Sequence, residues 1–180
     1  MKISTLTAVV VSLAAALPSS AASTGRRVFT DAEIVAVVDA ANQGEIDAAQ
    51  LASGKARDGG VKDFAEHMTK EHGDAKQDLL DVEAKAGLKP VDSDFSMNLA
   101  KQASDEAGRL GGLDGETFDR DYVEAQVADH AALLKALDED LIPSAKAPAL
   151  AALLRKIRPV VARHLAKARR LEAALERTEK

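Results

Sequence analysis

In each of four helix-like segments, one ionisable residue takes a place on a stripe that is otherwise apolar. Apolar residues of the first segment recur at positions 34, 38, 41, 48 and 52, and an acid fills the gap in this helical spacing. In the other three segments a histidine fills the gap. The four residues are Glu45, His72, His130 and His164. Because residues three and four apart share a helix face, all four side chains are expected to point into a core.

A carboxylate and three imidazoles form a donor set that suits a transition metal such as zinc, iron, manganese or copper. At about 1.5 Å per residue, Glu45 and His72 stand roughly 18 and 22 Å from the turn that joins their helices. His130 and His164 lie at comparable depths from a second turn. The sequence therefore predicts a metal site in the middle of a bundle. The alternative is a buried hydrogen-bond network of the same side chains, which only fixes the register of the helices.

Residues beside these positions have simpler interpretations. His67 is expected in solvent, paired with Glu71 one turn further on. Gln126, one turn before His130, is either a hydrogen-bonding partner of the site or an ordinary amide on the helix face. Tyr122 is expected to hydrogen-bond across the end of the bundle. None of these neighbours is counted among the predicted metal ligands.

Four long helices and a short one are expected to position these side chains. The long segments run over about 31–53, 61–86, 116–141 and 148–176. Thr30 can cap the first, Gly87 fits the C-cap of the second, and Pro143 and Pro148 bracket a turn before the last. Residues 88–115 carry a weaker amphipathic segment and then several glycines. This stretch is predicted to be a long crossover that contains one short helix.

This order predicts an all-α fold, a ferritin-like four-helix bundle with a long crossover between helices two and three. Short turns make helices one and two antiparallel, and likewise three and four. An up-down-up-down bundle would need only a short second link. The composition agrees, because Ala and Leu dominate an apolar content of 46% and only 3% of the residues are aromatic, which favours helix over sheet.

Charge and cysteine content exclude several classes of protein. The formal net charge of -5 argues against nucleic acid as a partner, because phosphate binding needs a basic face. The absence of cysteine excludes disulfides, thiolate catalysis, iron–sulfur centres and cysteine-type zinc sites. No nucleotide loop, serine-hydrolase elbow or His-Glu-x-x-His motif occurs. The sequence therefore indicates no reaction and favours a protein that is not an enzyme.

The N-terminus has the form of an export signal. Lys2 precedes a short apolar run over 6–17, which ends at Pro18 and is followed by small residues suited to cleavage. We expect a signal peptide over residues 1–22, a flexible leader over 23–29 and the bundle domain over 30–177. The mature protein is then periplasmic or secreted, with no stable membrane span after cleavage. An uncleaved membrane anchor is the alternative.

Several short pieces of the chain resemble one bacterial family. They are Gly44-Glu45-Ile46 with Gln50-Leu51-Ala52, residues 61–68, Glu71-His72, residues 118–122, Asp129-His130, and Arg158-Pro159 leading to His164. In their order and spacing the chain is similar to the domain-of-unknown-function family numbered 4142, exported proteins grouped with ferritin-like folds. The resemblance implies the bundle, the export signal and the four ionisable positions, but no activity.

Two departures from related patterns bear on the site. The family usually has Asp at the position of Glu71. Di-iron ferritins use Glu-x-x-His on two helices, whereas here an apolar residue or Thr stands three positions before each histidine. Any metal site would therefore be rich in histidine rather than bridged by carboxylates.

Three functions remain open from the sequence. The first is an exported binding or stress-related bundle that holds one transition-metal ion. The second is a structural or interaction module that binds an envelope component or a small ligand through its exposed faces. The third is a metal-dependent oxidoreductase, which would need an open coordination position. The sequence names neither the metal nor a partner nor an oligomeric state.

Overall fold

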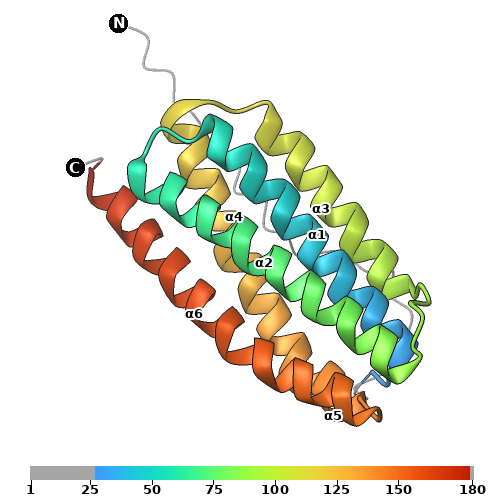
Figure 1. Ribbon diagram of the computed structural model, residues 1–180. Coiled ribbons are helices and arrows are strands. Elements are labelled where there is room, and N and C mark those ends of the chain that lie inside the picture. Colours follow the sequence, from blue (N-terminus) through green and yellow to red (C-terminus); the bar gives the residue numbers. More distant parts are fainter. Residues whose placement is uncertain (1–26, 179–180) are drawn as a thin grey trace, which may run out of the picture.

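The computed structural model describes residues 27–178, and the regular structure of this range is entirely helical (Figure 1). The helices are α1 (Asp31–Lys55), α2 (Gly59–Ala86), α3 (Asp94–Gly111), α4 (Gly115–Ala136), the π-helical turn η1 (Leu137–Leu141), α5 (Ile142–Ser144) and α6 (Pro148–Thr178). α1, α2, α4 and α6 form the bundle, and the predicted all-α ferritin-like fold is confirmed. The predicted signal peptide, residues 1–22, lies outside the described residues.

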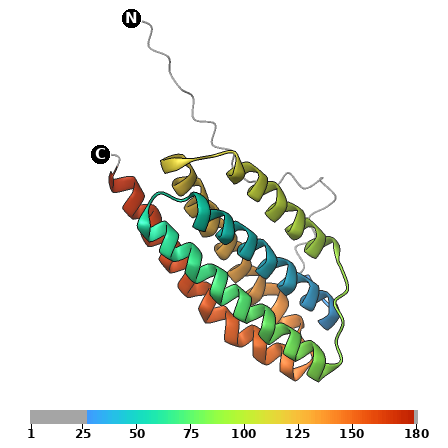
Figure 2. The ribbon, with the colours of Figure 1, turned by 45° about the horizontal axis from the view of Figure 1, so that its top comes forward.

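The chain direction distinguishes this bundle from a simple up-and-down one. α1 and α2 are antiparallel, and so are α4 and α6 (Figure 1). Between the two pairs the chain returns along the bundle through α3, so α2 and α4 run in the same direction (Figures 1 and 2). The long crossover between the second and third bundle helices is thus confirmed.

The helix in the crossover is longer than the short one expected from the sequence. α3 has 18 residues, begins after a cap at Ser93 and continues through Gly108 to Gly111. An internal glycine costs a helix about 1 kcal/mol relative to alanine, and packing of α3 along α1 offsets this cost. The two helices come very close at Gly44, where an added Cβ would lie 2.7 Å from the Cβ of Ala103. Tertiary packing therefore extends a helix whose own sequence is a weak helix former.

Local sequence sets the ends of the first two bundle helices. Thr30 and Glu33 form a reciprocal capping box at the start of α1. The side chain of Asp58 accepts a backbone N–H of the first turn of α2, so this helix begins at Gly59, two residues earlier than expected. Gly87 ends α2 with a left-handed φ of 63°, as the sequence predicts.

Two aspartates tie the turns of the bundle to helices of the opposite pair. Asp119 of α4 accepts the backbone N–H groups of residues 57 and 58, in the α1–α2 turn, at 2.8–3.2 Å. Asp31 of α1 accepts the backbone N–H groups of residues 146 and 147, ahead of α6, at 2.8 and 3.0 Å. Each helical pair is therefore fastened to the other at both ends of the bundle.

The end of the third bundle helix holds the segment that precedes α1. That helix reaches residue 141 as expected, but its last turn is the π-helical η1, in which Asp140 binds the side chain of Arg27. The backbone N–H of Phe29 donates to the hydroxyl of Ser144 at 3.2 Å, and the Phe29 ring is buried. A buried ring and two polar contacts therefore hold Arg27 and Phe29 against the bundle.

A polar layer divides the apolar core into two clusters. The cluster toward α5 includes Ile34, Leu79, Leu137 and Leu154. The cluster toward the α1–α2 turn includes Phe64, Met68, Phe118 and Val123. Between the clusters, each bundle helix contributes buried polar side chains, which are Asn42, Glu45, His72, Gln126, His130 and His164. We call these six residues the polar layer.

Candidate metal centre

Three histidines from three helices meet in the polar layer. His72 of α2, His130 of α4 and His164 of α6 are 4%, 0% and 2% exposed. Their ring centroids are 5.3–5.8 Å apart. One ring nitrogen of each lies within 4.8 Å of a ring nitrogen of the other two. The helical spacing of the sequence thus places all three imidazoles inward and at one level, and we call them the three-histidine centre.

In His72 and in His130, Nδ1 lies within hydrogen-bond distance of an acceptor oxygen. His72 Nδ1 lies 2.9 Å from Oδ1 of Asn42, whose own amide nitrogen donates to the carbonyl of Val38 and so fixes the amide orientation. His130 Nδ1 lies 2.9 Å from the backbone carbonyl oxygen of Gln126. Neither oxygen can donate, so each ring carries its proton on Nδ1.

The ring of His164 is held through Nε2 rather than Nδ1. Nε2 of His164 lies 2.6 Å from a carboxylate oxygen of Glu71. A carboxylate is an acceptor, so the ring donates its Nε2 proton, and Nδ1 carries the lone pair. Each ring is therefore fixed in orientation and in tautomer by an outer partner.

The opposite nitrogens of the three rings have no partner. Among the described residues, Nε2 of His72, Nε2 of His130 and Nδ1 of His164 are buried without a hydrogen bond. All three are lone-pair acceptors in the tautomers described above, so none can donate to another. Buried acceptors of this kind cost free energy unless a donor or a cation meets them. The arrangement matches a group that binds a cation through nitrogen.

Burial also keeps the rings of His72 and His164 uncharged. Burial, and then the neighbouring His130 and His164, lower the pKa of His72 from 6.5 to about 3. Burial lowers the pKa of His164 to about 4, against the opposing effect of its bond with Glu71. Neutral imidazole is the form that binds a metal ion, so the lone pairs are available at neutral pH.

Glu45 joins the polar layer beside His130 but stands apart from the three nitrogens. One of its carboxylate oxygens accepts the side-chain N–H of Gln126 at 2.7 Å, and the other lies 3.5 Å from Nδ1 of His130. The side chains whose ligand atoms lie within 4.8 Å of one another here are the three histidines, and Glu45 is not in that group. The acid therefore faces the protonated side of His130.

Sequence reasoning missed some of the partners in this layer. Asn42 lies three residues before Glu45, and this helical spacing could have indicated it. Of the two interpretations of Gln126, the hydrogen-bonding partner is correct. Tyr122 does not bond across the bundle end as expected, because its buried hydroxyl has no partner among the described residues. Burial, and then the charge of Glu45, raise its pKa.

His67 pairs with Glu71, as the sequence predicts, but it also approaches the three-histidine centre. Nε2 of His67 lies 3.4 Å from Glu71, and the His67 side chain is 43% exposed. Its ring lies edge-on to His164 with centroids 5.9 Å apart. This contact between α2 and α6 carries no signal in a single sequence, because it depends on how the two helices pack.

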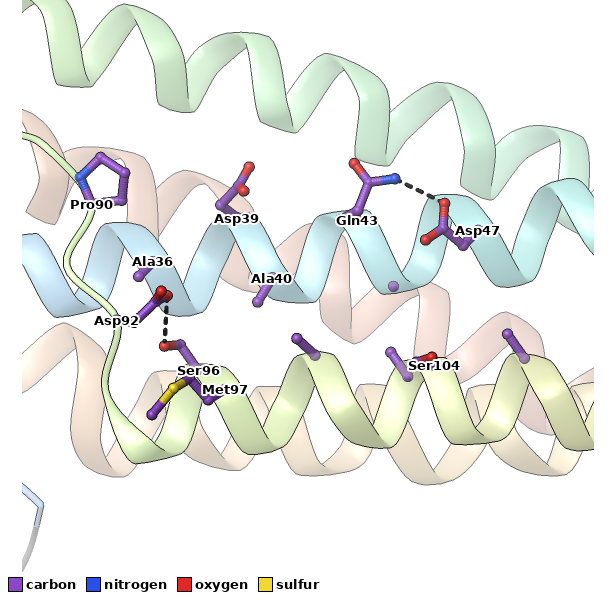
Figure 3. A pocket seen from close by; sticks show the side chains of 14 residues that line it. Ala36, Asp39, Ala40, Gln43, Asp47, Pro90, Asp92, Ser96, Met97 and Ser104 are labelled. Carbon is purple, nitrogen blue, oxygen red and sulfur yellow. Dashed lines mark hydrogen bonds between the residues drawn. The ribbon is translucent and has the colours of Figure 1, made fainter.

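A groove on the described surface lies elsewhere. It has a volume of about 720 Å³ and runs between α1 and α3 (Figure 3). Alanines and acids dominate its lining, and Gln43 donates to Asp47 within it at 2.8 Å (Figure 3). None of the histidines lines the groove. The candidate chemistry is therefore confined to the opposite face of α1.

The comparisons with known proteins give a family and a fold. The family model described as Domain of unknown function (DUF4142) matches residues 15–171. The chain belongs to the DUF4142 family. Its fold resembles the crystal structure of a DUF305 protein from Streptomyces coelicolor, with 15% sequence identity and a TM-score of 0.68. That match covers 81% of the DUF4142 chain and 93% of the other.

Membership of the family assigns no activity to the protein. No curated protein matches the sequence of this DUF4142 chain. Within residues 27–178, no helix is both long enough and apolar enough to cross a membrane. The family resemblance noted from the sequence is confirmed, and neither the family description nor the structural neighbour supplies a reaction.

Proposed function

We propose that this DUF4142 protein is exported and binds one transition-metal ion at its three-histidine centre. The observation that carries the proposal is the set of three buried ring nitrogens that lack a partner, on His72, His130 and His164. Three buried lone pairs on rings whose centroids lie within 5.8 Å of one another need a shared cation or an added donor. A hydrogen-bond network, the alternative interpretation, would instead pair these atoms within the protein.

The separation of the nitrogens supports a metal ligand set. The ligand atoms lie within 4.8 Å of one another, whereas nitrogens around a tetrahedral zinc ion are about 3.3 Å apart. The nitrogens would have to move toward one another by up to about 1.5 Å to hold one zinc ion. Three imidazoles leave a fourth coordination position, which water or a small ligand could take.

Outer partners support the same interpretation. Histidine ligands of metals commonly donate their second N–H to a carboxylate, a carbonyl or another acceptor, which fixes the tautomer. All three rings have such an acceptor, from Asn42, the Gln126 carbonyl and Glu71. The proposed site is thus oriented for metal binding before any ion arrives.

The surrounding charges favour a dication. Neutral imidazoles contribute no charge, and the acids of Glu45 and Glu71 each contact one of the rings. Burial acts to raise the pKa of Glu71, but its hydrogen bond with His164 and other neighbouring groups lower it overall. Glu45, which the sequence placed among the ligands, is proposed to balance the charge of the ion and to hold Gln126. Neither acid is placed to bridge two metals, which supports a single ion.

Export supports a role in the cell envelope or outside the cell. The proposed signal peptide over residues 1–22 would leave a periplasmic or secreted bundle, and a stress-related role in holding a metal ion fits that place. We propose binding, not turnover, because the features described above concern the holding of a cation.

Elemental analysis of protein purified without a chelator tests the proposal. Wild type is expected to carry one transition-metal ion per chain, or to take up one when titrated with Zn²⁺ or Co²⁺. A double variant with His72→Ala and His130→Ala should lose this ion. The matched control is His67→Ala, which removes a half-exposed histidine from the same helix and should keep it. Equal, sub-stoichiometric metal in all three proteins would refute the proposal.

A further inference from the structure

A second group of metal-binding side chains connects the three-histidine centre with the surface. His67, Glu71 and His164 each offer a ligand atom within 4.8 Å of the others. The exposed fraction of the side chain falls from 43% at His67 to 27% at Glu71 and 3% at His164. The group therefore extends from solvent to the edge of the buried centre.

His164 belongs to both groups. Its Nε2 contacts Glu71, and its Nδ1 is the unpaired atom. A neutral imidazole has one lone pair, so an ion that binds Nε2 leaves the ring proton on Nδ1. The outer and inner groups cannot both bind an ion through this ring at the same time. Occupation of only one group at a time is expected if an ion passes from the outer group to the inner one, and it is not expected of a site that holds two metal ions together.

We infer that His67, Glu71 and His164 form an outer station through which a divalent transition-metal ion reaches the three-histidine centre. This inference rests on the proposed function. Glu71 supplies negative charge that attracts a cation, and His67 supplies the exposed imidazole. When the ion moves inward, its bonds to His67, to Glu71 and to Nε2 of His164 break. Nδ1 of His164 releases its proton and binds the ion, while Nε2 takes up one proton and donates it in a hydrogen bond to Glu71. One proton is released and one is taken up, so no other reactant is needed.

The test compares the rate of metal binding with its equilibrium. Protein freed of metal by a chelator is mixed with Zn²⁺ in a stopped-flow instrument while a chromophoric chelator reports the free ion. We expect His67→Asn to slow both uptake and release by about tenfold, as for other losses of local steering at a site. The dissociation constant, measured by competition at equilibrium, should stay unchanged, which also shows that the variant is folded.

Variants of two acids on α2 separate the outer station from general charge effects. Glu71→Gln should slow uptake and also weaken binding, because Glu71 orients His164 as well. Asp81→Asn removes the same charge from an exposed position about 15 Å further along the helix. It should bind Zn²⁺ at the wild-type rate. A loss of rate in Asp81→Asn equal to that in Glu71→Gln would overturn the inference.

The outcomes distinguish failure of the station from failure of the centre. If wild type binds one ion tightly and His67→Asn takes it up at the wild-type rate, the outer station is wrong and the centre stands. A second tightly bound ion per wild-type chain would contradict the mutual exclusion. If wild type binds no ion tightly, the proposed function itself fails.

Discussion

The two faces of α1 border polar regions of opposite character. On the outer face lies the groove against α3, with a volume of about 720 Å³ and with Gln43 and Asp47 paired to each other. On the inner face, Asn42 and Glu45 reach a layer in which three ring nitrogens lack partners. In the groove these two polar side chains satisfy each other, whereas in the polar layer each histidine has one paired nitrogen and one unpaired nitrogen. Unpaired lone pairs, rather than volume, therefore mark the candidate site.

The largest expected effect is the loss of a ligand from the inner face. His130→Asn should weaken Zn²⁺ binding by more than about a hundredfold, beyond the range typical of a lost outer partner. Competition titration against a chelator of known affinity measures this change. Asp47→Asn, in the groove, is the control and should leave the affinity unaltered. Comparable losses of Zn²⁺ affinity in the two variants would show that the inner face of α1 is no more important for metal binding than the groove.

The polar layer should also make the metal-free protein sensitive to acid. The folded-state pKa values of His72 and His164, about 3 and 4, lie below the ordinary value of 6.5, first because the rings are buried and then because His130 lies beside both of them. Below pH 6.5 the unfolded chain binds protons that the folded chain does not. The stabilisation is therefore complete above about pH 6.5 and declines toward pH 4 and 3, by about 1.4 kcal/mol per pH unit for each ring.

Urea unfolding of the metal-free protein at pH 7, 6 and 5 measures this decline. A variant with His72→Leu removes one of the titrating rings and should show a shallower loss of unfolding free energy over the same range. Replacement of a buried polar group by an apolar one of similar size is also tolerated by many cores. Identical slopes for the variant and wild type would show that His72 does not titrate in this window.

An intermediate effect is expected from an outer partner of the centre. Asn42→Leu removes the acceptor of the His72 ring and should weaken Zn²⁺ binding by about 10–100-fold. Gln43→Leu makes the same kind of change at the next residue, on the face toward the groove, and should not alter binding. The pair isolates the direction of the side chain, because helix, neighbourhood and new residue are matched. Equal affinities in both variants would mean that Asn42 does not orient the ring.

The smallest effect on metal binding is expected from packing in the groove. Gly44→Ala puts a Cβ 2.7 Å from that of Ala103 and should destabilise the fold by about 1–3 kcal/mol without changing metal stoichiometry. Gly73→Ala, where an added Cβ meets nothing within 4 Å, should instead stabilise by about 1 kcal/mol. Thermal or urea unfolding separates the two. A stabilising Gly44→Ala would show that α3 is free to move away from α1.

The inward direction of the histidines could be predicted from the sequence because helical periodicity is local. The same periodicity gave the bundle, and local capping residues gave the start of α1 at Thr30 and the end of α2 at Gly87. Periodicity and capping residues do not predict the role of Glu71, because its contact with His164 depends on the packing of α2 against α6. They do not predict the length of α3 either, because contact with α1 overrides the low helix propensity of its glycines.

The aspartates that fasten the two ends of the bundle bear on the site from a distance. Because Asp119 holds the α1–α2 turn and Asp31 holds the segment before α6, neither hairpin can slide along the other without breaking a set of backbone hydrogen bonds. A slip by one residue would shift His72 by about 1.5 Å relative to the rings of the opposite hairpin. Two carboxylates at opposite ends of the bundle thus hold the helices in the register that sets the spacing of the three histidines.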